Sequence, residues 1–165
     1  MSSTRRLSGR VRAYRQVFER IELLLEGESD WIAAMATVAC ELHHAFDHFH
    51  WTGFYRAVDA DLLIVGPYQG THGCQRIDLG RGVCGTSAAE KRTIVVDDVR
   101  EFPGHIACDE GTRSEVVVPV FRADGTVLAV LDVDSRDPAA FGSEDAEGLE
   151  AICRRLGDGY GSVSR

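Results

Sequence analysis

The sequence has no long apolar run. Its longest nearly apolar stretches, residues 31–40 and 116–121, are much shorter than the roughly 20 residues that span a bilayer. No apolar signal-peptide core follows Met1, and internal repeats and low-complexity segments are also missing. We therefore expect a cytoplasmic protein that does not associate with a membrane.

Basic residues are scarce outside the start of the chain. Residues 1–15 contain five arginines and no acid, which leaves 13 basic and 26 acidic residues for the rest of the 165-residue chain. An acidic body lacks the charge that supplies most nucleic-acid affinity, so we expect no nucleic-acid partner. The length suits one domain, which we place at residues 12–158 between a flexible basic tail over 1–11 and a C-terminal tail over 159–165.

The five cysteines are an odd number, which excludes a pure disulfide scaffold. Cys40 and Cys153 lie on the apolar faces of expected helices, where we predict buried, inert thiols. Cys74, Cys84 and Cys108 fall in a glycine-rich and loop-rich region, where chemistry is more often carried. The spacing of these three lacks the close pairs typical of structural zinc, so a thiol redox function is favoured over a metal site.

Helical periodicity is confined to the two ends of the chain and one short internal segment. Residues 11–25, 31–46 and 143–156 repeat apolar side chains every three or four positions, and 80–90 is a glycine-rich entry into a short helix. Short runs rich in β-formers fill the middle, at residues 49–58, 62–68, 93–96, 115–121 and 126–134. The sequence Ala123-Asp124-Gly125 predicts a hairpin turn between the last two runs.

Strands clustered between terminal helices indicate an α+β fold. We predict an antiparallel sheet with the N- and C-terminal helices packed on one face, rather than a parallel doubly wound sheet.

Four segments and one cysteine carry a resemblance to a known family. They are GPYQG at 66–70 followed by Cys74, GRGVCGTSA at 80–88, FPGHIACDEGTRSEVVVPV at 102–120 and LDVDS at 131–135. Together they resemble the free methionine-(R)-sulfoxide reductases, a branch of the GAF domains, over residues 12–156. The resemblance implies reduction of free L-methionine-(R)-sulfoxide, thioredoxin as the electron source, a role in repair after oxidative stress, and no bound cofactor or metal. It also leaves open a homodimer formed through the terminal helices.

The same resemblance assigns roles to the three loop cysteines. Cys108 is the implied nucleophile, and Cys74 is the first choice of resolving thiol, with Cys84 the second. Attack on the sulfoxide would leave a sulfenic acid on Cys108, which the resolving thiol converts into a disulfide for thioredoxin to reduce. His105 lies three residues before Cys108 and is expected to stabilise its thiolate.

Acidic and aromatic residues complete the expected site. Strand alternation places Leu128, Val130, Asp132 and Asp134 on one face, and Glu115 opens the neighbouring hairpin strand. Three carboxyl groups at close range cannot all ionise at low cost, so at least one is expected to keep a proton for the sulfoxide oxygen. The resemblance implies that Glu115, Asp132 and Asp134 bind substrate.

Trp51 and Tyr55 alternate with Gly53 on the first strand, an arrangement expected to leave room for the S-methyl group of the substrate. The substrate carboxylate is expected to meet backbone amides near residues 82–85.

One alternative stays open at this point. A non-catalytic GAF module that senses a small ligand or redox state would use the same fold. Such sensors usually accompany an effector domain, for which this chain has no room, so we favour the enzyme.

Overall fold

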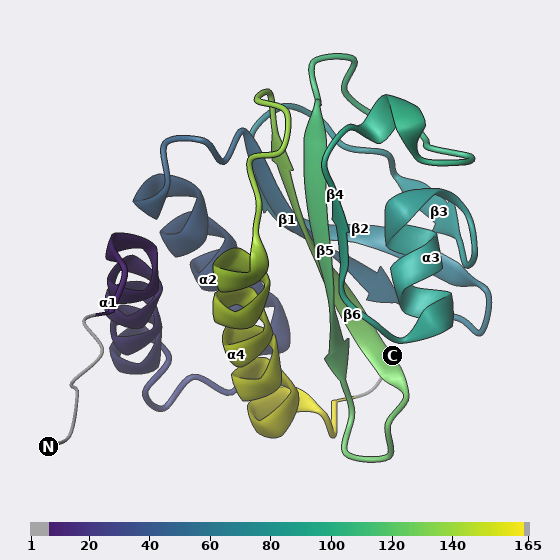
Figure 1. Cartoon of the computed structure of the whole chain (residues 1–165). Coiled ribbons are helices and arrows are strands. Elements are labelled where there is room, and N and C mark those ends of the chain that lie inside the picture. The colour runs from purple at the N-terminus through teal and green to yellow at the C-terminus, as the bar shows by residue number, and fades with distance from the viewer. Residues whose placement is uncertain (1–6, 164–165) are drawn as a thin grey trace, which may run out of the picture.

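One antiparallel sheet organises the chain, and the helices pack on its two faces (Figure 1). The computed structural model describes residues 7–163. The sheet order is β3-β2-β1-β6-β5-β4. Its strands are β1 (Trp51–Ala57), β2 (Leu62–Gln69), β3 (Arg76–Asp78), β4 (Ile94–Val96), β5 (Ser114–Phe121) and β6 (Val127–Ser135). The helices are α1 (Gly9–Leu24), α2 (Trp31–Ala45), α3 (Gly82–Glu90) and α4 (Ser143–Tyr160), with a 3₁₀ turn η1 (Val99–Glu101).

The predicted α+β class and the antiparallel sheet are confirmed. Each predicted strand is present within two residues of its expected bounds, whereas the three-residue elements β3 and η1 were not predicted. Helix α1 begins at Gly9, so the predicted basic tail over 1–11 is too long, and residues 1–6 lie outside the described part. Helix α4 runs two residues past the predicted domain end at 158, and residues 164–165 of the predicted C-terminal tail are not described.

The central strands are buried on both faces. On β5, Val116, Val118 and Val120 belong to one apolar cluster with side chains of α1, α2 and α4, and α4 lies directly on this strand. Val117 packs into a second apolar cluster beneath α3. Figure 1 shows α1, α2 and α4 on one side of the sheet and α3 on the other. Alternate residues of a strand face opposite sides of the sheet. Residues of these strands on the α3 side that do not belong to the second apolar cluster can therefore carry a functional site.

The strand β6 departs from simple alternation near its start. A register shift between Val120 and Phe121 of β5 marks an irregularity in the pairing with β6. Leu128 therefore packs with the terminal helices, and its predicted place on the same face as Val130 and Asp132 is wrong. Beyond this point the predicted alternation holds.

The hairpin between β5 and β6 turns where the sequence predicts. Gly125 has φ of 80°, a conformation that glycine adopts without steric cost. The Asp124 carboxylate accepts hydrogen bonds from the Thr126 backbone N–H at 2.9 Å and from its hydroxyl at 2.7 Å. Within residues 7–163, no helix is both long and apolar enough to cross a membrane.

A buried acid joins the first and last helices. Asp145, 1% exposed at the start of α4, accepts hydrogen bonds from the Arg10 guanidinium at 2.7 Å and the Tyr14 hydroxyl at 2.9 Å. It also accepts the Gly142 backbone N–H at 2.9 Å. Arg10, assigned to the tail from the sequence, is therefore part of the folded domain.

We predict that Asp145→Ala lowers the free energy of unfolding by about 2–4 kcal/mol, because it leaves Arg10 and Tyr14 without their shared buried partner. Urea denaturation followed by circular dichroism measures this. The matched control is Glu19→Ala, which removes an ion pair with Arg15 whose side chains are 70% and 63% exposed, and should change stability by no more than about 0.5 kcal/mol. Equal effects of the two substitutions would contradict the assignment.

Candidate active site

Three carboxyl groups gather on the α3 face of the sheet. Glu115 on β5 pairs directly with Asp134 on β6, and Asp132, two residues earlier on β6, lies on the same face. On the other side of β6, Asp134 pairs with Trp51 and Asp132 with Gly53. Adjacent antiparallel strands therefore bring the predicted acids and the predicted aromatic strand together.

Burial makes ionisation of this acid cluster costly. Glu115 and Asp132 are each 5% exposed, and Asp134 is half-buried. Burial, and then the neighbouring aspartates, raise the pKa of Glu115 well above its ordinary value. Burial raises the pKa of Asp132 to about 7, and burial with the charge of Asp132 raises that of Asp134. At neutral pH the cluster therefore holds at least one proton.

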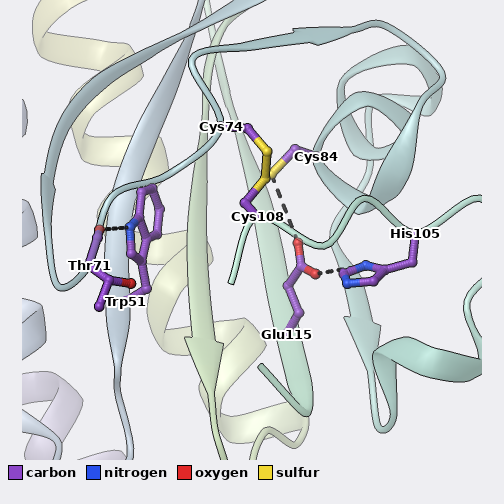
Figure 2. Close-up of a disulfide and its surroundings, with 7 residues drawn as sticks. All are labelled: Trp51, Thr71, Cys74, Cys84, His105, Cys108 and Glu115. Atoms are coloured by element: carbon purple, nitrogen blue, oxygen red, sulfur yellow. Dashed lines mark hydrogen bonds and ion pairs between the residues drawn. A yellow bond between two sulfur atoms is a disulfide. The ribbon is translucent and has the colours of Figure 1, made fainter. Parts of the chain in front are cut away.

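A disulfide between Cys74 and Cys108 lies beside the acid cluster (Figure 2). Cys74 is in the loop between β2 and β3, and Cys108 is in the long loop between η1 and β5. Their Cα atoms are 5.2 Å apart although 34 residues separate them in the chain. The fold thus pairs the predicted nucleophile with the first-choice resolving cysteine.

Cys84 is adjacent but chemically different. It lies in the first turn of α3, is a free thiol, and is buried. Its Sγ is 4.0 Å from Glu115 Oε1. Burial, followed by the charges of Asp132 and Glu115, raises the pKa of this thiol well above its ordinary value. A thiol held neutral is a poor nucleophile, so this arrangement favours Cys74 over Cys84 as the partner of Cys108.

His105 faces the acid cluster. Its Nδ1 lies 3.9 Å from Glu115 Oε2, on the side of that carboxyl away from the cysteines (Figure 2). Burial lowers the pKa of His105 while that of Glu115 is raised, so the two groups meet as neutral polar partners rather than as an ion pair. Cys108 is bonded to Cys74 in this structure, so the expected support of its thiolate by His105 stays a prediction.

The aromatic pair forms one wall of the pocket. The rings of Trp51 and Tyr55 stack with centroids 5.7 Å apart, and Tyr68 stacks on Trp51 at 5.2 Å. A side chain at Gly53 would meet the Trp51 ring at 2.7 Å and would also overlap Tyr68. Gly53 therefore gives room to these rings, and space for a substrate methyl group beside the aromatic pair stays a prediction.

The predicted site residues line a single pocket, with Cys74 joined to it through its disulfide. Sequence reasoning missed four polar residues that line it, namely His72, Arg81, Asp109 and Thr112. Their place in the same glycine-rich loops as the cysteines was the available signal. Gly82, Val83 and Cys84 in the first turn of α3 also line the pocket, and no side chain caps this helix. The Gly85 N–H already donates to the Arg81 carbonyl at 3.0 Å, so the expected contact of a substrate carboxylate with amides near residues 82–85 stays a prediction.

Among residues 7–163, one group has the spacing of metal ligands. Atoms of Cys84, Glu115 and Asp132 lie within 4.8 Å of one another, and all three side chains are buried. This group differs from the three loop cysteines, which the sequence analysis weighed as zinc ligands. The sulfurs of Cys74 and Cys108 are bonded to each other and are not available to a metal. By spacing alone, the three groups could hold a small cation.

The remaining two cysteines differ in exposure. Cys153 is 1% exposed and packs in the helix-side core, as predicted. Cys40 is only half-buried, with its Sγ 3.7 Å from His44 Nδ1, so its prediction as a core thiol is wrong. The buried face of α2 includes the neighbouring residue Ala39 but not Cys40.

Comparisons with known proteins give the family. The profile of the GAF domain matches residues 30–158. The free methionine-R-sulfoxide reductase of Saccharomyces cerevisiae is 40% identical over 151 residues, which cover 86% of this chain and 84% of the yeast protein. The enzyme of the same name from Escherichia coli is 39% identical, with 81% of this chain and 79% of that protein covered.

A solved structure agrees in fold and sequence. The free methionine-R-sulfoxide reductase from Neisseria meningitidis, determined in complex with its substrate, matches with a TM-score of 0.88 and 42% identity. The match covers 94% of this chain and 92% of that one.

We predict that Glu115→Gln raises the free energy of unfolding by about 1–2 kcal/mol at pH 8 and by much less at pH 4. A carboxyl whose pKa is raised on folding binds its proton more tightly in the folded state, so stability falls as pH rises above the unfolded pKa, roughly 4. Denaturant titrations across this pH range measure the effect. Glu19→Gln, at an exposed position, is the control; an equal pH dependence of Glu115→Gln and wild type would refute the prediction.

Proposed function

Because the chain belongs to the GAF domain family and, within it, to the free methionine-R-sulfoxide reductases, we propose that it reduces free L-methionine-(R)-sulfoxide to L-methionine. The observation that carries the proposal is the Cys74–Cys108 disulfide beside a buried acid cluster. A sulfoxide sulfur accepts a nucleophile readily only when its oxygen is protonated, so the reaction needs a thiolate and an acid together.

The first step uses both halves of the site. The Cys108 thiolate attacks the substrate sulfur while a protonated carboxyl delivers its proton to the oxygen. The sulfur–oxygen bond of the substrate breaks and its oxygen leaves as hydroxide, while the Cys108 sulfur stays bonded to the methionine sulfur. Hydroxide then attacks the Cys108 sulfur, the sulfur–sulfur bond breaks, methionine leaves with the electron pair, and Cys108 becomes a sulfenic acid. We assign the proton to Glu115, because burial and both aspartates hold its pKa well above the ordinary range. The Cys74 thiol then displaces hydroxide from the sulfenic acid, which gives the disulfide and water.

The other pocket groups recognise the amino acid. Asp132 and Asp134, once ionised, attract the ammonium group of a free amino acid, which a residue inside a peptide lacks. The uncapped first turn of α3 offers amides to the substrate carboxylate. Trp51 and Tyr55 supply an apolar wall for the methyl group. This arrangement favours the free substrate over peptide-bound sulfoxide.

A disulfide must be reduced before another cycle can begin. We assign this step to thioredoxin in the cytoplasm, because a dithiol in a reducing compartment regenerates both cysteines by exchange. The activity repairs methionine after oxidative stress, and pairing of two chains through the terminal helices remains part of the proposal. No bound cofactor or metal is needed for this chemistry.

We expect the free (R)-epimer to be consumed in the presence of thioredoxin, thioredoxin reductase and NADPH. Both epimers within a peptide should react at least about a hundredfold more slowly, because a site built for one charged group rejects ligands that lack it. The free (S)-epimer should also react more slowly, because with its methyl group on the aromatic wall its sulfoxide oxygen points away from the acid cluster. Chromatography of the products measures all four rates. Formation of the disulfide without consumption of any sulfoxide would indicate a redox sensor instead.

Cysteine variants separate the two thiol roles. Cys108→Ser should lower turnover by about a thousandfold or more, since it removes the nucleophile. Cys74→Ser should release one methionine per chain and then stop with thioredoxin, because the sulfenic acid has no resolving thiol. Cys40→Ser, at a position remote from the pocket, should leave turnover unchanged. Continued turnover by Cys74→Ser would move the resolving role to Cys84.

A further inference from the structure

The two cysteine loops are linked by a hydrogen bond as well as by the disulfide. The Thr71 hydroxyl donates to Asp109 Oδ2 at 3.0 Å, three residues before Cys74 and one residue after Cys108. Thr71 and Asp109 are 38 positions apart in the chain, so the contact is not a local turn. Neither residue takes part in the chemistry proposed above.

Thr71 is firmly attached to the sheet. Its backbone carbonyl accepts a hydrogen bond from the Trp51 indole N–H at 2.8 Å, as Figure 2 shows. Two residues later the loop lies directly on the aromatic pair, since a side chain at Gly73 would meet the Trp51 ring and the Tyr55 hydroxyl, each at 2.9 Å. The loop that carries Cys74 is therefore fixed to β1 on the N-terminal side of the cysteine.

The loop that carries Cys108 is held much less. Within the described chain, every hydrogen bond of residues 104–112 joins positions at most three apart, except the one from Thr71. Ile106 packs against the apolar cluster beneath α3, and His105 approaches Glu115. When the disulfide is reduced, the Thr71 bond is thus the one remaining hydrogen bond between this loop and a distant segment of the described structure.

Asp109 is prepared to accept this bond. Its other oxygen accepts the Gly111 backbone N–H at 2.8 Å, which fixes the carboxylate within its own loop. This bond, followed by the one from Thr71, lowers the pKa of Asp109, so the group is ionised at neutral pH. A hydrogen bond to an ionised acceptor is stronger than one between neutral groups.

We propose that Thr71 is a positioning residue for the resolving step: its hydrogen bond to Asp109 holds the Cys108 loop against the Cys74 loop while the disulfide is open. The step is the attack of the Cys74 thiol on the Cys108 sulfenic acid, which forms one disulfide and releases one water. This role rests on the proposed function, but the underlying property, closure of the Cys74–Cys108 disulfide, can be measured without any sulfoxide.

The size of the effect follows from the hydrogen bond. Holding two loops together raises the effective concentration of one thiol at the other. The hydrogen bond and the disulfide are thermodynamically linked. If the hydrogen bond shifts the equilibrium toward the disulfide by some factor, the disulfide strengthens the hydrogen bond by the same factor. A net contribution typical of one hydrogen bond to a partly exposed charge corresponds to about a threefold to tenfold change in the equilibrium.

The first experiment equilibrates the purified protein with reduced and oxidised glutathione and measures the fraction with a closed Cys74–Cys108 disulfide by mass spectrometry. Thr71→Val keeps the side-chain shape but removes the hydroxyl, and should lower the effective concentration about threefold to tenfold. Thr71→Ser keeps the hydroxyl and should stay near wild type. The matched control is Thr126→Val, which loses a threonine–aspartate hydrogen bond in the β5–β6 turn and should not change the equilibrium.

A second experiment follows one turnover of the reduced enzyme with free methionine-(R)-sulfoxide. Thr71→Val should release methionine at the wild-type rate but close the disulfide about threefold to tenfold more slowly, so that more Cys108 sulfenic acid is trapped by dimedone. A merely structural role would change both steps or neither. In a double-mutant cycle, Thr71→Val should have little further effect on the glutathione equilibrium once Asp109→Ala is present.

Wild-type values for Thr71→Val in both experiments would overturn the proposal. If the protein consumed no sulfoxide, the glutathione equilibrium would still decide whether Thr71 aids closure, so failure of the proposed function and failure of this inference are distinguishable.

Discussion

The site depends on carboxyl groups that are buried side by side on an antiparallel sheet. The pairing of β5 with β6 sets Glu115 opposite Asp134, with Asp132 two residues along the same face. Like charges at this distance and burial oppose ionisation, so the folded state keeps a proton that the unfolded chain would release at neutral pH. The opposite face of the same strands belongs to a large apolar core that also contains side chains of α1, α2 and α4, and this burial offsets the penalty. The cost of burying the carboxyl groups on one face of the sheet is thus offset by apolar packing on the other face.

The two halves of the proposed chemistry are held with different rigidity. The acids lie on central strands, where the ladder and two apolar clusters fix them. The thiols of Cys74 and Cys108 lie on loops, and the proposed chemistry requires them to separate when the disulfide is reduced and to approach again when it forms. Cys84 lies between these halves, on the first turn of α3, where burial keeps its thiol neutral. A fixed acid and a movable thiol pair suit a reaction in which sulfur must first meet substrate and then meet a second sulfur.

Much of this arrangement could be predicted from the sequence, because alternating apolar and polar residues indicate the strands and glycines indicate the turns between them. The placement of Asp132 and Asp134 on one face followed from a period of two, and the family motifs named the cysteines. Leu128 was misplaced because a register irregularity leaves no mark in composition. Cys40 was misplaced because one helical position separates a core residue from a half-buried one. The Thr71–Asp109 bond joins loops 38 residues apart and depends on tertiary structure alone.

The proposed chemistry requires that a carboxyl group of the acid cluster stays protonated at neutral pH. Infrared difference spectroscopy at pH 7 measures it directly, because a protonated carboxyl has a C=O stretching band that a carboxylate lacks. We expect such a band in the wild-type protein, a weaker band in Glu115→Gln, and an unchanged band in Glu19→Gln. A wild-type spectrum at pH 7 with no protonated-carboxyl band would contradict the account.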